Sequence, residues 1–332
     1  MTEMSKLAPV LRLNMSGRGR NGEEEAARYQ AAIELSEYAD RNGFAVVNVE
    51  EHHGAEIGWL PSPLILGAAI ATRTSEVQIR GSAVLATLYD PIRFAEDVAM
   101  LDVLSKGRFY FVLGQGYREA EYHMMDRDFA GRGAATDHLI DTLLKAWTEQ
   151  SFEYRGETVW VSPRPYSKPY PPFAYGGMSR AAAKRAARWG LPFLPGQPEP
   201  EIEAFYAEEC RKHGHEPKVE RFSDLSQLFI ARDPDAAWQE LGPYLIQEVQ
   251  QYARWARSDV KRVYDAGSTS IDDLRAAGTY EILTPEQCVE RGRQRLAEDR
   301  FHPIIHPLAG NIPIDRAWDC MRLFCEEVLP RL

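Results

Sequence analysis

The sequence lacks any apolar run that approaches the roughly 20 residues a helix needs to cross a bilayer. Its beginning, MTEMSKLAPVLRLN, also lacks the apolar core of a secretion signal and leads almost directly into a strand-like segment. These absences argue against a membrane protein and against an exported one. We therefore expect a cytoplasmic protein without a membrane partner.

Cysteine and positive charge are scarce as well. The four cysteines form no C-x-x-C pair, which argues against a disulfide framework and predicts free thiols. The 39 Lys and Arg residues are outnumbered by 49 Asp and Glu residues, so the formal net charge is −10. Because no stripe of basic residues stands out, we expect no nucleic-acid partner.

What is present is an ordinary globular composition, with 44% hydrophobic and 27% charged residues. Short apolar segments, several of them continuously apolar as in a sheet covered on both faces, predict eight strands. These are Leu11–Ser16, Phe44–Glu50, Val77–Val84, Arg108–Gly114, Phe173–Gly176, Leu191–Leu194, Leu225–Ala231 and His302–His306. Helical patterns separate most of them, at Glu23–Arg41, Pro63–Arg73, Pro91–Leu104, Thr136–Gln150, Ser179–Trp189, Pro234–Trp255, Pro285–Asp299 and Pro313–Val328.

Eight strands with helices between them predict an α/β fold, a (β/α)8 TIM barrel with insertions, in one domain covering residues 1–332. A doubly wound open sheet is the structural alternative, but it offers no reason for the number of strands to reach eight. Phe152–Pro172 fits the alternation poorly, and its Arg155-Gly156 pair predicts a small hairpin before a Pro-rich connection. Arg257–Leu283 is the second expected insertion, a polar excursion.

Ionisable residues follow the second predicted strand. Side chains alternate along a strand, so Glu50 and His52 share one face while Glu51 and His53 share the other. At the carboxyl end of a barrel strand, one of these pairs would face the mouth, where a histidine can exchange a proton near neutral pH. His52 is our catalytic candidate. The alternative is a polar cluster that binds neighbouring backbone groups.

Small residues follow two further strands. Gly81-Ser82-Ala83-Val84 either lets a flat ligand approach the backbone or serves tight packing between strand and helix, and both interpretations stay open. Gly114-Gln115-Gly116 is a lone G-x-G. A dinucleotide fingerprint needs a third glycine at position 119, which is Glu119, so the Rossmann interpretation fails.

The turn after the fifth strand, Gly176-Gly177-Met178-Ser179-Arg180, opens a helix. Free backbone N–H groups, the helix dipole, the Ser179 hydroxyl and the Arg180 cation together suit a phosphate. The alternative is an ordinary serine N-cap.

A metal site is a further alternative. His52, His302 and His306 would converge if the second and eighth strands presented their ends to one mouth, as in a metal-dependent barrel hydrolase. The H-E-x-x-H motif is absent, however, and we expect no metal.

These segments resemble the bacterial luciferase-like monooxygenases, which are flavin-dependent (β/α)8 barrels. The matching pieces span nearly the whole chain: GFAVVNVEEHH, PSPLILGAAIATRT, GSAVL, DPIRFAEDVAMLDVLSKGRFYFVLGQGY, YGGMSRAAAKRAARWGLPF and HPIIHPLAG with FCEEVLP. Their order, particularly EHH followed by PIRFAEDVAMLDVLSKGR, is specific.

The resemblance implies roles by position. His52 matches the family's active-site histidine near the reactive edge of the flavin ring. Ala83 and Val84 match a dipeptide under the ring, where members often carry a non-prolyl cis peptide. The remaining cofactor-binding positions are Gly114 and Gln115 at the ring and Gly177, Met178, Ser179 and Arg180 at the phosphate. Two residues depart from luciferase: Met178 replaces an acidic residue, and Gln115 replaces an arginine.

The resemblance also implies a function, namely a monooxygenase that uses reduced FMN and O2 to oxidise a small organic substrate by hydroxylation or Baeyer–Villiger insertion. A separate flavin reductase would supply the reduced FMN, and the chain would form a homodimer. A deazaflavin-dependent hydride transferase of the same fold and a non-catalytic flavin-binding subunit are alternatives. Trp59, Tyr117 and His53 are the expected substrate contacts, together with the Phe152–Pro172 hairpin and the polar excursion.

Overall fold

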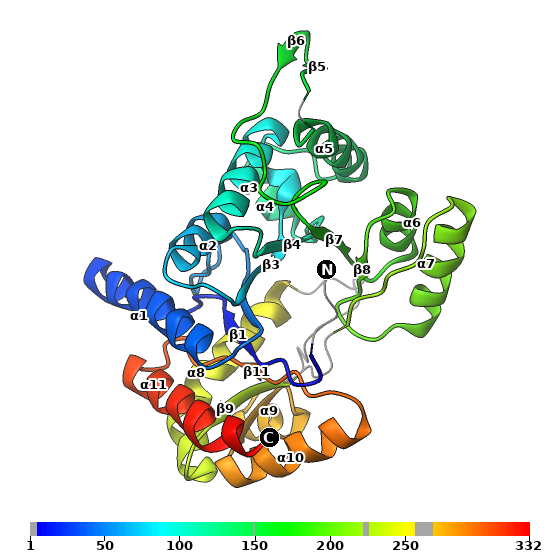
Figure 1. Ribbon diagram of the computed structural model, residues 1–332. Helices are drawn as coiled ribbons and strands as arrows, with labels where there is room; N and C mark the ends of the chain where they lie inside the picture. Colours follow the sequence, from blue (N-terminus) through cyan, green and yellow to red (C-terminus); the bar gives the residue numbers. More distant parts are fainter. Residues whose placement is uncertain (1–4, 149, 222–225, 256–267) are drawn as a thin grey trace.

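The computed structural model describes residues 5–148, 150–221, 226–255 and 268–332. Within these residues, parallel strands form one sheet in the order β10-β9-β11-β1-β2-β3-β4-β7-β8, with helices around its outside (Figure 1). Helices connect most of the successive strands, which is the connectivity of a (β/α)8 barrel. The predicted fold class is confirmed.

The strands of this sheet are β1 (Val10–Leu13), β2 (Val46–Val49), β3 (Gln78–Val84), β4 (Phe109–Leu113), β7 (Phe173–Gly176), β8 (Phe193–Leu194), β9 (Gln227–Ile230), β10 (Tyr280–Leu283) and β11 (Ile304–Ile305). The helices are α1 (Gly22–Arg41), α2 (Pro63–Ala71), α3 (Pro91–Ser105), α4 (Glu119–Met124), α5 (Arg132–Ala146), α6 (Arg180–Arg188), α7 (Pro200–Lys212), α8 (Pro234–Trp255), α9 (Ile271–Ala277), α10 (Pro285–Glu298) and α11 (Ile314–Leu323). None of the described helices has the length and apolarity needed to cross a membrane.

Alternation along the strands separates two layers of side chains. Leu11 of β1 and Val47 of β2 join the large core between sheet and helices. Inward-facing Val10, Val46 and Ile304 form a separate small cluster. The burial of a continuous apolar run on both faces explains why the strands could be recognised from sequence.

The interior of the barrel is polar at its middle. Arg12, Asn48, Arg80 and Tyr110 are paired in register across four neighbouring strands, and all four are buried. Glu220, which follows an isolated parallel bridge between Val219 and Phe193 of β8, interacts with both Arg80 and Tyr110. A side chain beyond β8 therefore reaches the inner faces of β3 and β4, as the curl of the sheet requires.

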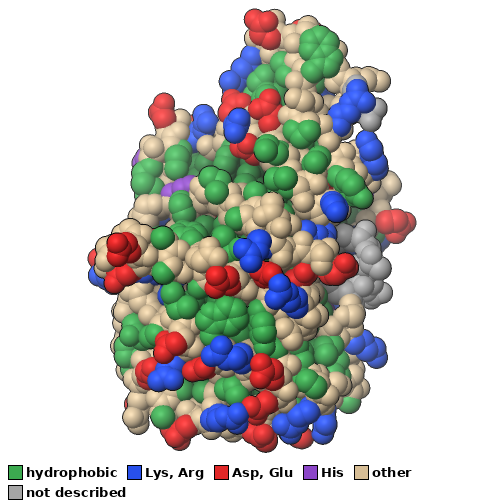
Figure 2. Space-filling model, turned by 60° about the vertical axis from the view of Figure 1, so that its left-hand side comes forward, with side chains coloured by type: hydrophobic (Ala, Val, Ile, Leu, Met, Phe, Trp, Pro, Cys, Tyr) green, Lys and Arg blue, Asp and Glu red, His purple; other side chains and the backbone are tan. Residues whose placement is uncertain are grey.

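All eight predicted strands are present, although shorter than predicted in most cases. β9 begins at Gln227, and the predicted starting residue, Leu225, lies outside the described residues. The predicted hairpin is confirmed as β5 (Phe152–Tyr154) paired antiparallel with β6 (Glu157–Val159). It projects from the body of the molecule (Figure 1, Figure 2). The four cysteines are free and buried, as expected.

Four elements were not predicted: α4, α7, α9 and β10. Within the expected insertion Arg257–Leu283, residues 268–283 are ordered: they form α9 and β10 and bury Leu274, Tyr280 and Ile282. Residues 257–267 lie outside the described part of the chain. Polar and apolar residues are mixed in these short elements, so the few side chains that they bury form no recognisable helix or strand pattern.

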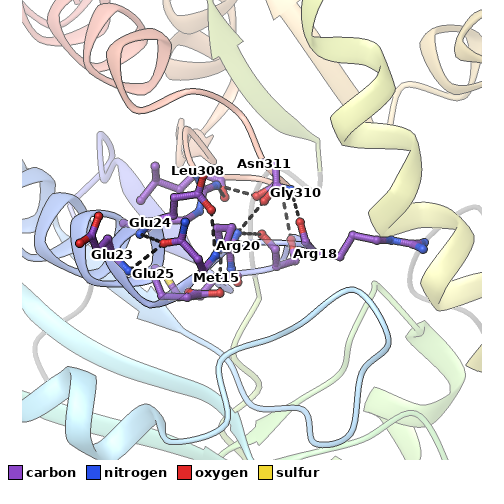
Figure 3. Close-up of polar contacts among 12 residues, drawn as sticks. Met15, Arg18, Arg20, Glu23, Glu24, Glu25, Leu308, Gly310 and Asn311 are labelled. Carbon is purple, nitrogen blue, oxygen red and sulfur yellow. Dashed lines mark hydrogen bonds and ion pairs between the residues drawn. The ribbon is translucent and has the colours of Figure 1, made fainter.

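The loops that leave β1 and β11 are tied together at one edge of the barrel mouth (Figure 3). Arg20 donates hydrogen bonds to the carbonyls of Met15 at 3.0 Å and Ser16 at 3.2 Å, and to Oδ1 of Asn311 at 2.8 Å. The Asn311 amide in turn donates to the carbonyl of Arg18 at 2.6 Å. These contacts hold the loops after β1 and β11 together on the side of the barrel where the two strands are neighbours.

Candidate active site

A buried ionic network lies where β1, β2 and β11 meet α8. Arg12 donates Nε and Nη2 to the two oxygens of Glu50, the second at 2.9 Å, and its Nη1 lies 3.1 Å from Glu248 of α8. The Asn14 amide donates to the same Glu248 carboxylate at 2.7 Å. Burial raises the pKa of Glu248, but Arg12, His306 and Asn14 outweigh that effect, so its pKa is lowered. Glu248 is therefore a buried, compensated carboxylate.

His306 belongs to this network. Its Nε2 lies 3.2 Å from Oδ1 of Asn14, and its Nδ1 lies 3.3 Å from Nη1 of Arg12. Burial first, and then the Arg12 cation, lower the pKa of His306 to about 3. His306 is thus neutral near pH 7 and serves the structure of the interior.

The three histidines of the alternative metal site do not converge. His302 precedes β11 and bonds to the Ser5 carbonyl at 3.1 Å, whereas His52 follows β2. Because the strands are parallel, these two residues lie at opposite ends of the barrel. Across the described part of the chain, no group of three His, Cys, Asp or Glu residues is arranged to hold a metal ion.

His52 is fixed by a buried carboxylate at the carboxyl end of β2. Its Nδ1 lies 3.0 Å from Oε1 of Glu121 on α4, and that oxygen also accepts from the His53 backbone N–H at 3.0 Å and from Arg118 at 2.8 Å. Burial raises the pKa of Glu121, but the bonds from His52, the His53 backbone and Arg118 together lower it. Glu121 thus stays ionised, so His52 carries its proton on Nδ1 and leaves Nε2 for other partners.

Aromatic rings surround the His52 imidazole. The ring centroids of Trp255 and Trp59 lie 4.8 and 5.3 Å from it. Those of Tyr252 and Tyr117 lie at 6.0 and 6.1 Å. The expected substrate contacts Trp59 and Tyr117 therefore lie beside the catalytic candidate, together with two rings from α8.

His53 points the other way, as the strand alternation predicted. Its Nε2 lies 2.9 Å from Oε1 of the buried Glu51. Glu51 also accepts from the Leu85 backbone N–H at 2.7 Å and from the Tyr89 hydroxyl at 2.6 Å. On this side, His53 and Glu51 thus form a polar cluster bound to neighbouring groups, which was the alternative interpretation.

Small residues meet at the ends of β3 and β4. The non-prolyl cis peptide joins Ser82 to Ala83, one position before the Ala83-Val84 dipeptide that the resemblance indicated. Ala83 packs against the inner cluster of the barrel, and a Cβ added to Gly114 would lie 2.7 Å from its methyl group. The Val84 side chain lies in the outer core, while its carbonyl accepts from the Gly114 N–H at 2.9 Å. The half-buried Ala83 is compatible with the ligand interpretation, whereas Gly114 and the Val84 side chain fit the packing interpretation.

The turn after β7 contains a serine N-cap followed by an exposed arginine. Ser179 is the N-cap of α6 and accepts from the Ala182 N–H at 3.2 Å, so the N-cap interpretation is confirmed. The exposed Arg180 lies 4.8 Å over the ring of Phe205 on α7. Gly177 and Met178 are half-buried in the turn before them.

Gln115 bonds to the Thr136 hydroxyl at 3.3 Å, at the first turn of α5. A Cβ added to the neighbouring Gly133 would meet Arg185 Nη2 at 2.9 Å and Gln115 Nε2 at 3.9 Å. Arg185 itself bonds to Asp137 at 3.1 Å and to the Tyr175 hydroxyl at 3.3 Å. A cation therefore lies near Gln115, supplied by α6.

Four residues of the site were missed: Arg118, Glu121, Tyr252 and Trp255. Arg118 and Glu121 belong to the unpredicted α4 and the residue before it. Tyr252 and Trp255 belong to α8, a helix that the sequence did predict. They lie four and seven residues after Glu248, and this spacing places all three residues on one face of the helix. Nothing in the sequence indicated that this face meets His52.

Comparison with known proteins gives one family. Luciferase-like monooxygenases match residues 12–302. The alkanal monooxygenase alpha chain of Photorhabdus laumondii is 25% identical over 330 residues, covering 90% of this chain and 91% of that one. The oxygenase component of the flavin-dependent trigonelline monooxygenase of Acinetobacter baylyi is 30% identical over 145 residues, covering 43% of this chain and 40% of that one.

Solved structures share the fold. Monooxygenase RslO1 from Streptomyces bottropensis has a TM-score of 0.76 at 23% identity, over 98% of this chain and 99% of that one. The oxygenating constituent of 3,6-diketocamphane monooxygenase from Pseudomonas putida, in complex with FMN, has a TM-score of 0.69 at 16% identity, over 98% of both chains. An F420-dependent secondary alcohol dehydrogenase has a TM-score of 0.67 at 16% identity, also over 98% of both chains.

The buried His306 predicts a pH dependence of stability. Its pKa in the folded protein, about 3, is below the value of about 6.5 expected in the unfolded chain. The contribution of the neutral His306 to the free energy of unfolding is therefore fully present above pH 6.5 and is lost as the pH falls toward 3. The free energy of unfolding is measured by urea titration between pH 7 and 5 in wild type and in His306→Gln. We expect its loss per pH unit to be smaller in His306→Gln than in wild type, by up to about 1.4 kcal/mol.

The exposed His123, substituted in the same way, should keep the wild-type slope. Equal slopes in His306→Gln and wild type would contradict this assignment.

Proposed function

Because this chain belongs to the luciferase-like monooxygenase family, we propose that it uses reduced FMN and O2 to oxidise a small organic substrate at the mouth of its barrel. It is a flavin-dependent oxidoreductase, in keeping with the monooxygenases named above. The observation that carries the proposal is the imidazole of His52, which the buried Glu121 carboxylate holds at the carboxyl end of β2. Enzymes with this fold place their catalytic groups at that end.

The residues at the strand ends fit a flat ring. Ala83 and Gly114 present nothing larger than a methyl group, and Gly114 has no room for one beside Ala83. We assign the ring to Ala83, Gly114 and the backbone of Val84. Gln115 is assigned to the flavin at the end of β4. The anionic tail is assigned to the turn Gly177, Met178, Ser179 and Arg180, where one hydroxyl and one exposed cation lie at the start of α6.

When bound, reduced flavin supplies two electrons to O2, so that one oxygen atom enters the substrate and the other leaves as water. The protein contributes an oriented imidazole and a site from which water is excluded. His52 donates Nδ1–H to Glu121, so Nε2 is the ring atom that accepts or returns a proton at the mouth. The rings of Trp59, Tyr252 and Trp255 cover the imidazole and exclude water from it.

A separate flavin reductase is part of the proposal. The Acinetobacter relative is named as the oxygenase component of its monooxygenase, and this chain has no G-x-G-x-x-G fingerprint at its G-x-G. The second candidate is hydride transfer with a deazaflavin. It is favoured by the F420-dependent dehydrogenase, which shares the fold over 98% of this chain.

Anaerobic titration separates these two functions. We expect reduced FMN to bind the purified protein more tightly than an oxidised deazaflavin, and the admission of air to consume O2 and reoxidise the flavin. Flavin absorbance and an oxygen electrode provide the measurements. Tight binding of the deazaflavin, with no oxygen consumption in the presence of reduced FMN, would contradict the monooxygenase proposal in favour of hydride transfer.

His52 is the residue to test within this site. In His52→Ala, we expect substrate turnover to fall by roughly 10²-fold or more, because the ring nitrogen that accepts or returns a proton at the mouth is lost. Flavin affinity should stay close to the wild-type value, since strand ends and the α6 turn bind the cofactor. His123→Ala is the matched control, because its side chain is 69% exposed on α4. Unchanged turnover in His52→Ala would remove the residue from the mechanism.

We also propose that the chain is a homodimer, paired through α2 and α3. Ile65 of α2 is 74% exposed, and Met100 of α3 is 55% exposed. Val103 and Leu104 at the end of α3 are exposed as well. Such a patch is typical of a protein interface.

Charge placed in this patch tests the dimer. We expect the wild-type protein to have twice the mass of one chain by light scattering, and the double variant Ile65→Glu, Met100→Glu to have the mass of one, because burying two carboxylates in an apolar interface is unfavourable. Met124→Glu, at a 52% exposed position of α4, should leave the mass unchanged. A monomeric wild type, or a dimeric double variant, would contradict the proposal.

A further inference from the structure

Glu51 is a buried carboxylate that follows β2 and binds the chain just after β3, the strand end to which we assign the flavin ring. Its exposed fraction is 2%. Oε2 accepts a hydrogen bond from the Leu85 backbone N–H at 2.7 Å. Oε1 accepts from the Tyr89 hydroxyl at 2.6 Å and lies 2.9 Å from Nε2 of His53. Because a carboxylate removed from water needs such donors, these contacts fix Glu51 and the groups that bind it.

One peptide group beside this carboxylate is held at both of its polar atoms. The group joins Val84 to Leu85. Its carbonyl oxygen accepts from the Gly114 N–H at 2.9 Å, on the side of β4, and its own N–H donates to Glu51 at 2.7 Å. Since a peptide group is planar, bonds at its oxygen and its nitrogen together fix its orientation. The backbone of Val84, which we assign to the flavin ring, therefore depends on Glu51.

The Glu51 side chain continues the connection between β2 and β3 beyond the end of their backbone ladder. The last pair of that ladder is Val49 with Gly81, whereas β3 continues to Val84. On the side of β2, the hydrogen bond from Leu85 to Glu51 then serves in place of a ladder bond. The end of β3 is thus joined to β4 by backbone and to β2 by one side chain.

Glu51 also binds both flanks of the short 3-10 helix η1 (Ala86–Leu88). Leu85 precedes this helix and Tyr89 follows it. Burial, and then the Glu51 carboxylate, raise the pKa of Tyr89. The Tyr89 hydroxyl therefore keeps its proton and remains a donor to Glu51. Removal of the carboxylate would release the chain on both sides of η1.

His53 is the residue in contact with Glu51 that can carry a positive charge. Two other buried carboxylates near the mouth, Glu121 and Glu248, each have an arginine within 3.1 Å. No lysine or arginine of the described residues forms an ion pair with Glu51, whose contact of this kind is with Nε2 of His53. A buried carboxylate needs compensation, and the His53 imidazole provides it.

We propose that Glu51 is a positioning residue, which holds the backbone of Ala83–Leu85 in the place where the flavin ring binds, and that His53 acts through Glu51. That this backbone receives the flavin ring rests on the proposed function. Glu51 then affects how tightly the ring binds and has no effect on the phosphate at the turn before α6. The role of His53 thus differs from the substrate contact expected from the sequence.

Flavin affinity in a double-mutant cycle tests both parts of the proposal. Reduced FMN and reduced riboflavin, which lacks the phosphate, are titrated by anaerobic calorimetry into wild type, Glu51→Gln, His53→Ala and the double variant. Glu51→Gln turns an NH2 group toward at least one of the buried donors, so we expect both flavins to bind about 10-fold more weakly. His53→Ala should weaken both about 3-fold. The double variant should bind like Glu51→Gln, because both changes disrupt one set of contacts.

Two further variants serve as controls. His53→Gln keeps an N–H donor near the position of Nε2 and should bind both flavins as wild type does. Glu119→Gln makes the same chemical change as Glu51→Gln on a side chain that is 55% exposed on α4, and it should also bind as wild type does. Circular dichroism verifies that each variant is folded. If Glu51→Gln does not fold, equal affinities of His53→Ala and His53→Gln would overturn the proposal.

Wild-type affinity of folded Glu51→Gln for reduced FMN would overturn the proposal, as would a loss confined to FMN. Losses that multiply in the double variant would overturn the role of His53, because they would show that it acts independently of Glu51. Oxygen consumption by wild type alongside any of these results would leave the proposed function standing. The expected cycle without oxygen consumption would leave Glu51 its role and reject the monooxygenase. Failure of wild type to bind reduced FMN would overturn both.

Discussion

The buried contact between Arg12 and Glu248 determines how the mouth of this barrel is built. A carboxylate inside a protein is unfavourable unless a cation and hydrogen bonds compensate it, and Glu248 has Arg12, Asn14 and Ser16 as partners. This requirement fixes α8 against the inner faces of β1 and β11. The remainder of the helix then has little freedom, and Tyr252 and Trp255 lie against His52.

A second buried carboxylate holds the opposite wall. Glu121 collects His52, the His53 backbone and Arg118 on a single oxygen, which joins the end of β2 to α4. The imidazole is thus oriented from one side by charge and enclosed from the other by aromatic rings. A fixed imidazole that can accept or return a proton, in a site that excludes water, suits the oxidation of a substrate by O2 and reduced flavin without side reactions.

The sequence predicted the barrel well because its central strands are buried on both faces and read as continuous apolar runs. It also predicted the place of His52, since a histidine just after such a strand lies at the carboxyl end. It did not predict α4 or α7, whose segments EAEYHM and PEIEAFYAEECRK are rich in charge and bury only part of one face. Glu121 and Trp255 were missed for a different reason. Their roles depend on contacts between elements far apart in the chain, and local periodicity carries no information about such contacts. The alternative histidine triad does not form, because His302 precedes β11 whereas His52 follows β2, and the strands are parallel.

The central claim is that the flavin lies across the ends of β3 and β4 with its reactive edge beside His52. A crystal structure of the protein soaked with oxidised FMN tests this claim most directly. The account predicts the ring over Ala83 and Gly114, the phosphate at the turn before α6, and the contact between His52 and Glu121 retained. A ring bound elsewhere, or one separated from His52 by a layer of protein side chains, would contradict it.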